Sequence, residues 1–82
     1  MDYQLTKHAE DALEKRGIPR EWMERVFSRP EWTEPDALVA GVEHRLGPIA
    51  EFQGRILRVV VNAAVDPVRV ITVYFDRRRK SR

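Results

Sequence analysis

The C-terminal part of the chain has the alternating pattern of a β-hairpin. Residues 54–77 read GRILRVVVNAAVDPVRVITVYFDR, with two runs rich in β-branched and aromatic residues on either side of Asp66-Pro67. These residue types fit a pleated, partly buried surface, whereas Asp and Pro favour turns and do not extend a ladder of backbone hydrogen bonds. The pattern therefore predicts two antiparallel strands joined at Asp66-Pro67.

Side-chain alternation divides each of these strands into two faces. One face of each strand is mixed, with Ile56, Arg58, Val60 and Asn62 in the first strand and Val68, Val70, Thr72, Tyr74 and Asp76 in the second. If helices cover the apolar faces, Arg58, Thr72 and Tyr74 share an open surface, which is where function is expected. The wholly apolar faces consist of Leu57, Val59 and Val61, and of Ile71, Val73 and Phe75.

Two short amphipathic helices are predicted ahead of the hairpin. The first begins after Thr6, which can cap it, and ends near Arg16, because Gly17 can adopt the left-handed conformation that ends a helix. The second starts at Pro19 and is closed by Pro30. Neither is long enough to be stable alone, so each is expected to pack on the sheet. Their apolar stripes are Leu5, Ala9, Ala12 and Leu13, and Trp22, Met23, Val26 and Phe27.

The remaining segments complete an α+β fold. Residues 42–49, VEHRLGPI, are predicted as a strand that residues 50–54 connect to the hairpin. Residues 1–5 are expected to be an extended lead-in, and residues 31–39 a loop. The predicted architecture is two N-terminal helices packed on a three-stranded antiparallel sheet.

Size and composition restrict the class of protein. The 82 residues suffice for one domain near the lower size limit for a single core, with residues 1–76 assigned to it and residues 77–82 to a basic tail. The absence of cysteine excludes thiolate catalysis and fits a reducing compartment. No signal-peptide pattern opens the chain, and no apolar run approaches the ~20 residues of a membrane span. A soluble, cytoplasmic protein without membrane contact is expected.

The net charge of +2 hides an uneven distribution. Residues 1–36 contain six basic and nine acidic side chains, and residues 37–82 contain nine basic and four acidic ones. Five of those nine basic residues lie within residues 77–82. A basic end on an acidic helical half suits a polyanion such as RNA or an acidic protein partner. A frayed, solvated terminus explains the same charges equally well.

Three segments resemble a known family. LTKHAEDALEKRGIPREW, RILRVVVN and VRVITVYFDRR are similar to the bacterial and archaeal domain-of-unknown-function family 4258, and the similarity covers nearly the whole chain. By size and element order the resemblance extends to the BrnT-like and RelE-like toxins of type II toxin-antitoxin systems. It implies a RelE/BrnT-like fold, a toxin-like endoribonuclease activity independent of metal, and an acidic antitoxin that covers the basic face.

Cleavage of RNA without a metal needs a base, an acid and cations that stabilise the charged phosphorane. The catalytic candidates are His8, Arg58 and Tyr74, and His8 joins the other two if the first helix crosses that end of the sheet. His44 and Arg45 have opposite strand parity, so at most one of them points with Arg58, and the family resemblance favours Arg45. The candidates for substrate binding are Lys7, Arg16, Arg45, Arg55, Arg77 and Arg78.

Structural roles are the alternatives for these residues. His8 can bond to backbone groups and Arg16 can complement the C-terminal end of its helix. Arg58 can be a solvated side chain and Tyr74 an amphipathic cover for the sheet. No metal-ligand spacing and no phosphate-binding glycine loop is present, so neither metal nor cofactor is expected. The rival hypothesis for the chain is a non-catalytic interaction module that pairs through an open sheet face or edge strand, with itself as a homodimer or with another protein.

Overall fold

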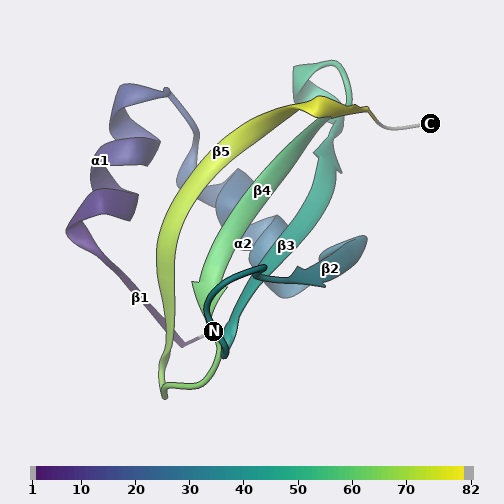
Figure 1. Ribbon diagram of the computed structural model, residues 1–82. Coiled ribbons are helices and arrows are strands. Elements are labelled where there is room, and N and C mark those ends of the chain that lie inside the picture. The colour runs from purple at the N-terminus through teal and green to yellow at the C-terminus, as the bar shows by residue number, and fades with distance from the viewer. Residues whose placement is uncertain (1, 81–82) are drawn as a thin grey trace.

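Two helices cover one face of a five-stranded mixed sheet (Figure 1). The computed structural model describes the backbone of residues 2–80 and the side chains of residues 2–78. The predicted α+β class and both predicted helices are confirmed. In chain order the elements are β1 (Tyr3–Leu5), α1 (Lys7–Lys15), α2 (Arg20–Ser28), β2 (Trp32–Pro35), β3 (Val42–Ile49), the 3₁₀ turn η1 (Ala50–Phe52), β4 (Arg55–Asn62) and β5 (Val68–Lys80).

The helix ends form where their sequence signals lie. The Thr6 hydroxyl accepts a hydrogen bond from the backbone N–H of Ala9 at 3.0 Å and thereby caps α1. Gly17 follows the helix with a φ of 62°, in the region that glycine enters at least cost. The apolar stripes face inward, and the buried helical residues are Ala9, Ala12, Leu13, Met23, Val26 and Phe27.

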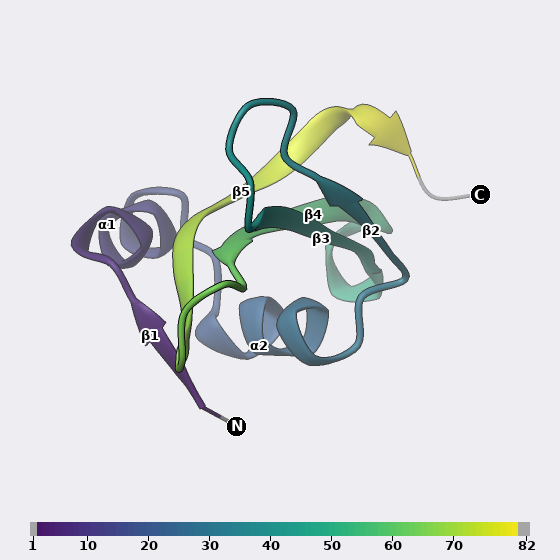
Figure 2. The same ribbon diagram turned by 60° about the horizontal axis from the view of Figure 1, so that its bottom comes forward.

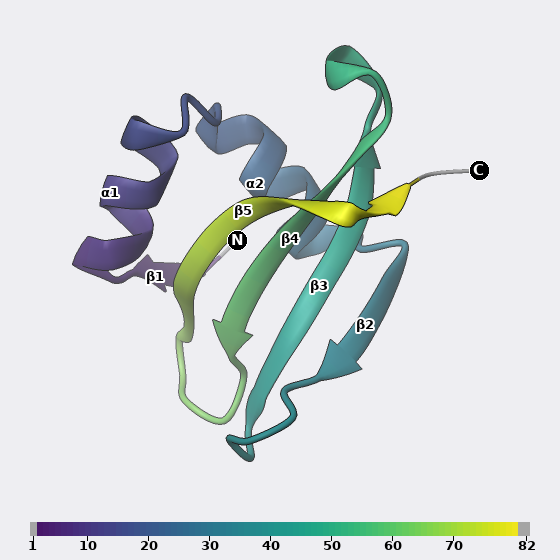
Figure 3. The ribbon, with the colours of Figure 1, turned by 45° about the horizontal axis from the view of Figure 1, so that its top comes forward.

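The sheet contains two strands that the sequence did not predict. The strand order is β1-β5-β4-β3-β2, with β1 parallel to β5 and the other pairs antiparallel. β1 lies in the expected lead-in, of which Met1 is outside the described residues, and β2 lies in the expected loop. The three predicted strands, β3, β4 and β5, are present and antiparallel, but the prediction that the sheet contains only these three is wrong. Both additional strands are short edge strands, and Figure 3 shows β2 at the sheet edge remote from α1.

A bulge in β5 changes which of its residues face the helices. The register pairs Val61 with Val70, where strict alternation requires Ile71. Val70 is fully buried in the main core, and Val68 packs against that core. The prediction that Val68 and Val70 lie on the opposite face is therefore wrong, because the extra residue reverses the parity at the start of the strand.

The segment from Thr6 to Arg16 covers the edge of β5 past the residues that pair with β1. The Thr6 N–H and hydroxyl donate to the carbonyl oxygens of Val70 and Ile71 at 3.1 and 3.0 Å. Arg16 Nη1 donates to the carbonyl oxygen of Val73 at 3.2 Å. Exposed edge groups invite pairing with other chains, and these bonds occupy three of them.

The sheet buries side chains on both of its faces. The helix-covered face carries the main core, which includes Met23, Val59 and Val73. On the opposite face, which we call the outer face, Leu46 and Ile56 are fully buried. Figure 2 shows why: β2 with its following loop, and the C-terminal half of β5, both curve away from α2. The face predicted to be open is therefore partly enclosed.

The last strand includes residues that the sequence assigned to a tail. β5 continues to Lys80, so residues 77–80 extend the strand, while residues 81 and 82 lie outside the described residues.

Within the described part of the chain, neither helix has the length and apolar character needed to cross a bilayer.

Candidate functional site

A cluster of charged side chains surrounds Arg58 of β4 on the outer face. The Arg58 guanidinium donates to Oδ2 of Asp76 in β5, from Nε at 3.2 Å and from Nη2 at 2.6 Å. Nη1 lies 3.5 Å from Oε1 of Glu34 in β2. Arg58 is only 8% exposed and Asp76 only 7%, so these charges are held away from bulk water. We call Glu34, Asp36, His44, Arg58 and Asp76 the Arg58 cluster.

His44 of β3 connects Arg58 to the loop after β2. Its Nδ1 lies 2.7 Å from Nη1 of Arg58, and its Nε2 lies 2.8 Å from Oδ1 of Asp36. A guanidinium nitrogen can only donate, so Nδ1 accepts and carries no proton. The imidazole is therefore held as the neutral tautomer that has its proton on Nε2 and donates it to Asp36.

Asp36 also organises the loop in which it lies. Its Oδ2 accepts hydrogen bonds from the backbone N–H groups of Leu38 at 3.1 Å and Val39 at 2.9 Å. The hydrogen bond from His44, followed by these two backbone bonds, lowers the pKa of Asp36 below its ordinary value. The ionised carboxylate thus ties the loop to β3.

The buried pair at the centre of the cluster is stabilised in its charged form. For Asp76 the largest influence is burial, which raises the pKa, but hydrogen bonds from Arg58 and from the backbone of Arg78 outweigh it and the pKa is lowered. Burial likewise lowers the pKa of Arg58, yet the hydrogen bond to Asp76 and the electrostatic influence of the neighbouring Tyr74, Asp76 and Glu34 side chains raise it overall. Arg58 is therefore a fixed, paired cation and not the solvent-exposed one that the sequence suggested.

Tyr74 of β5 lies beside this cation. It is the cross-strand neighbour of Arg58 in the β4–β5 register, so both side chains leave the sheet on the outer face. Tyr74 is half-buried, and no other described residue is hydrogen-bonded to its hydroxyl. A phenol next to a fixed guanidinium can donate its proton to an anionic ligand.

Arg45 does not belong to this cluster. Its side chain lies on the helix-covered face, where Nη1 donates to the carbonyl oxygen of Phe27 at 2.9 Å and the guanidinium carbon lies 4.7 Å from the centroid of the Phe27 ring. Nε is 2.9 Å from Oε2 of Glu43. The preference for Arg45 over His44 as the companion of Arg58 is therefore wrong, because the register of β3 turns the histidine to the outer face.

The structure does not bring His8 to Arg58. His8 and Lys7 are exposed on α1, which packs against β5 through the main core on the other face of the sheet. Arg16, at the end of the same helix, is engaged with the β5 backbone as described above. The condition under which His8 joins the site, a helix crossing over the outer face, is not met.

The other cations offered by the sequence lie near the C-terminal end of β5. Arg77 and Arg78 are exposed, and the Arg78 side chain is 93% exposed with Nε 4.0 Å from Oδ1 of Asp76. Arg55 is also exposed and pairs in register with Lys80. Arg55, Arg77 and Arg78 are available to a polyanion, whereas Arg58 is available only if it leaves its carboxylates.

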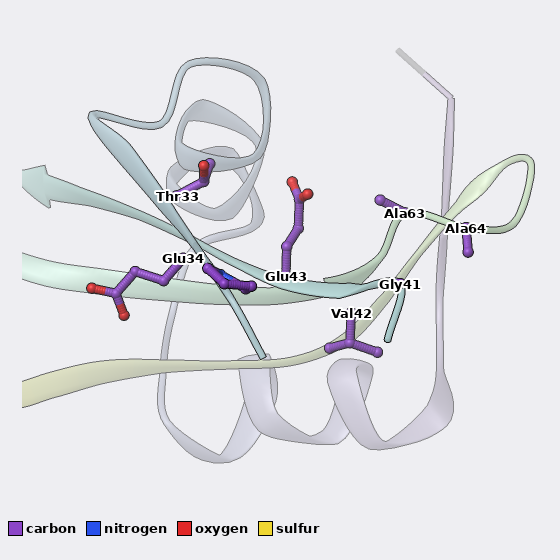
Figure 4. Close-up of a pocket in the computed structure, with 8 residues that line it drawn as sticks. Thr33, Glu34, Gly41, Val42, Glu43, Ala63 and Ala64 are labelled. Atoms are coloured by element: carbon purple, nitrogen blue, oxygen red, sulfur yellow. The ribbon is translucent and has the colours of Figure 1, made fainter. Parts of the chain in front are cut away.

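A hollow of about 410 Å³ lies beside the cluster, between β2, the start of β3 and the loop after β4 (Figure 4). Its lining includes Glu34, Glu43, Gly41 and Ala64, and Figure 4 shows the two carboxylates pointing in different directions. Gly41 has a φ of 86°, and a Cβ there would lie 2.8 Å from the Cβ of Ala64. The lining holds no cation, so the hollow does not suit a phosphate group.

Glu34, Asp36 and Asp76 of the Arg58 cluster were not candidates from the sequence, whereas His44 was considered there beside Arg45. Glu34 and Asp36 lie in the segment expected to be a loop, so their register against β3 could not be derived. Asp76 has the parity of Tyr74, and His44 has the parity of the β3 residues on the outer face. Alternation along the strands could therefore place both residues on that face, but it could not predict which atoms meet there.

Across the described residues, no group of three or more His, Cys, Asp or Glu side chains is arranged to hold a metal ion.

One known protein family matches most of the chain. The family model described as Domain of unknown function (DUF4258) matches residues 5–75. The chain belongs to this family. The matched region contains α1, α2 and every member of the Arg58 cluster except Asp76. No curated protein and no solved structure matches the chain. The predicted membership in DUF4258 is thus confirmed, and the similarity to RelE-like toxins stays a prediction.

Proposed function

We propose that this DUF4258 protein acts on RNA as a toxin-like endoribonuclease that needs no metal ion. The observation that carries the proposal is the Tyr74 phenol placed beside Arg58, a buried cation whose orientation Asp76 and His44 determine. The exposed arginines near the end of β5 supply attraction for a polyanion. Small size and the order of elements, with two helices ahead of the main hairpin, support the RelE/BrnT-like interpretation.

The reaction is an attack of the ribose 2′-oxygen on the adjacent phosphorus. The P–O5′ bond breaks, and the products carry a 2′,3′-cyclic phosphate and a 5′-hydroxyl. When the phosphate displaces the carboxylates from Arg58 and draws its guanidinium away from His44, the Nδ1 lone pair is released and takes the 2′-hydroxyl proton, while Asp36 stabilises the imidazolium. Tyr74 gives its proton to O5′ and later recovers one from His44 through water. His44 thus takes the role of base first assigned to His8.

Incubation of the purified protein with a structured RNA tests this proposal. Tyr74→Phe removes only the phenol oxygen and is expected to slow cleavage by about 10²–10⁴-fold, the usual worth of a positioned acid or base. His8→Ala is the matched control and is expected to cleave like the wild type. Cleavage is expected to persist with a chelator, and the 3′ ends should be cyclic phosphates. Intact RNA with the wild-type protein, or full activity of Tyr74→Phe, contradicts the proposal.

A non-catalytic interaction module is the second candidate, and one observation favours it. Leu38 and Val39 in the loop after β2 are 92% and 54% exposed, which places two apolar side chains in solvent beside the edge strand β2. A second copy of the chain or another protein that pairs with this edge fits this hypothesis. A Leu38→Asp variant that loses self-association or partner binding in light scattering, while RNA stays intact, supports this candidate over the first.

A further inference from the structure

Three aromatic rings meet at the end of the molecule where η1 leads into β4. Phe52 of η1 lies 6.1 Å from the ring of Trp22 in α2, in a stacked arrangement with an interplanar angle of 30°. Phe75 of β5 lies 4.9 Å from Phe52 and 6.3 Å from Trp22. Phe75 and Trp22 are half-buried, whereas Phe52 is 37% exposed. Phe52 therefore forms the solvent-facing part of this aromatic cluster.

Arg55 adds a planar cation to the exposed ring. Its guanidinium carbon lies 4.8 Å from the Phe52 centroid, and the residue is exposed. A guanidinium over an aromatic ring is a flat, positively charged surface in solvent. Nucleobases stack on aromatic rings and on guanidinium planes of this kind in proteins that bind single strands.

The charges around Phe52 favour an anionic ligand. Arg77 and Arg78 are exposed on β5, whose end pairs with the start of β4 at Arg55. The nearest carboxylate in sequence, Glu51, is held by two hydrogen bonds from Arg25, at 2.8 and 2.7 Å. That pair neutralises the acidic group next to the ring, so the surface remains basic.

We infer that Phe52 and Arg55 form a stacking site for one base of a single-stranded nucleic acid whose phosphates follow Arg77 and Arg78. The inference rests on the proposed function and adds to it the place where the RNA is held. Phe75 directly follows Tyr74 in β5, so the stacking site and the Arg58 cluster lie on opposite faces of one strand. A strand of RNA stacked at Phe52 passes the β5 arginines on its way to Tyr74.

A pair of oligonucleotides tests the contribution of the base. A labelled single-stranded oligouridylate and an abasic strand of the same length carry equal phosphate charge, and their binding is compared by fluorescence anisotropy. The measurement uses a Tyr74→Phe background, in which cleavage is expected to be slow. The base-bearing strand is expected to bind about 5- to 100-fold more tightly than the abasic one, as expected for base stacking on an aromatic ring.

Substitutions then assign that difference to the two residues. Phe52→Leu keeps an apolar side chain over Trp22 and Phe75, and Arg55→Lys keeps the charge but loses the planar group. Either change is expected to reduce the preference for the base-bearing strand, with affinity for the abasic strand nearly unchanged. Arg69→Ala, at the opposite end of β5 and exposed, is the matched control that should keep the preference. Circular dichroism shows whether each variant is folded.

Each result decides between the alternatives. Equal binding of the two strands, or a preference unchanged in both Phe52→Leu and Arg55→Lys, overturns the inference and leaves the cleavage assay to judge the proposed function. Tight binding of polyglutamate without any base preference also overturns it and marks this surface as a protein contact. A base preference that depends on Phe52, in a protein that never cleaves RNA, supports the stacking site and contradicts the catalytic proposal.

Discussion

β4 presents Leu57 and Val59 to an apolar core on its helix-covered face, whereas its outer face presents Arg58 to carboxylates and an imidazole. Both faces exclude most water, but by different means. The apolar side is stabilised by area removed from water, which is non-directional and tolerates exchange of similar shapes. The charged side depends on each group having its partner, because an unpaired buried charge is costly. A buried set of paired charges therefore specifies the positions of its residues more than it adds stability.

The largest expected effect comes from removing the cation of the outer face. Arg58→Ala leaves Asp76 buried without its main partner and is expected to lower the free energy of unfolding by about 3–5 kcal/mol. Urea unfolding followed by circular dichroism measures it. The double variant Arg58→Met with Asp76→Leu removes both charges and should recover most of that loss. A single variant within about 1 kcal/mol of the wild type would show that the pair is not buried in solution.

A cavity created on the helix-covered face is expected to lower the free energy of unfolding by a similar or slightly smaller amount. Met23 is fully buried, and Met23→Ala is expected to cost about 2–5 kcal/mol through lost burial and an unfilled space. Met23→Leu, which conserves volume, should cost less than about 1.5 kcal/mol. The shape-conserving change on the outer face, Asp76→Asn, is expected to cost more than Met23→Leu in the same urea experiment. The reverse order contradicts the distinction between the two faces.

Acid is expected to weaken the outer face first. The pKa values of Asp36 and Asp76 are lowered in the folded protein, so their contribution to stability is present above the unfolded value of about 4 and is lost as pH falls through the folded values. The Arg25 hydrogen bonds lower the pKa of Glu51 to about 2, which acts in the same direction.

Unfolding titrations between about pH 2 and pH 6 measure this acid dependence. An Arg25→Gln variant separates the Glu51 contribution, and the double variant without Arg58 and Asp76 should show a flatter profile. A profile that keeps its slope in the double variant assigns the acid sensitivity elsewhere.

The smallest predicted effect concerns which ring nitrogen of His44 carries the proton. Nitrogen chemical shifts of His44 are expected to report the tautomer with its proton on Nε2, because Arg58 occupies Nδ1 as a donor. His8, which is exposed on α1, is the internal reference for a solvated imidazole. A proton on Nδ1 of His44 means that the contact with Arg58 is absent in solution and removes the proposed base from its position.

The elements with strong local signals were predictable. Thr6, Gly17 and Pro19 mark helix boundaries through their own backbone and side-chain chemistry, and the hairpin follows from two β-branched runs around a turn. β1 and β2 have no such signal, since three or four residues become a strand only when a neighbour supplies the ladder. The bulge in β5 escaped prediction for a related reason: either parity of Val70 and Ile71 gives an apolar face, and only packing selects one.

The candidate site was predictable in one of its contacts. Parity placed Arg58 and Tyr74 on a common face, and the register agrees. Parity also left His44 and Arg45 as alternatives, and nothing local distinguishes an arginine that bonds to a helix carbonyl from one that lies on the outer face.

The amino-acid sequence by itself determined the α+β class, the two helices and the main hairpin, because periodicity, capping and turn chemistry act over a few residues. Its similarity over most of the chain also determined the family. Only the tertiary structure decided that Arg58 is buried and paired, that His44 and Asp36 join it, and that Phe52 and Arg55 meet near the end of β5. Those contacts join residues from different strands and loops. Their geometry depends on sheet curvature and register, which the whole set of packed elements determines together.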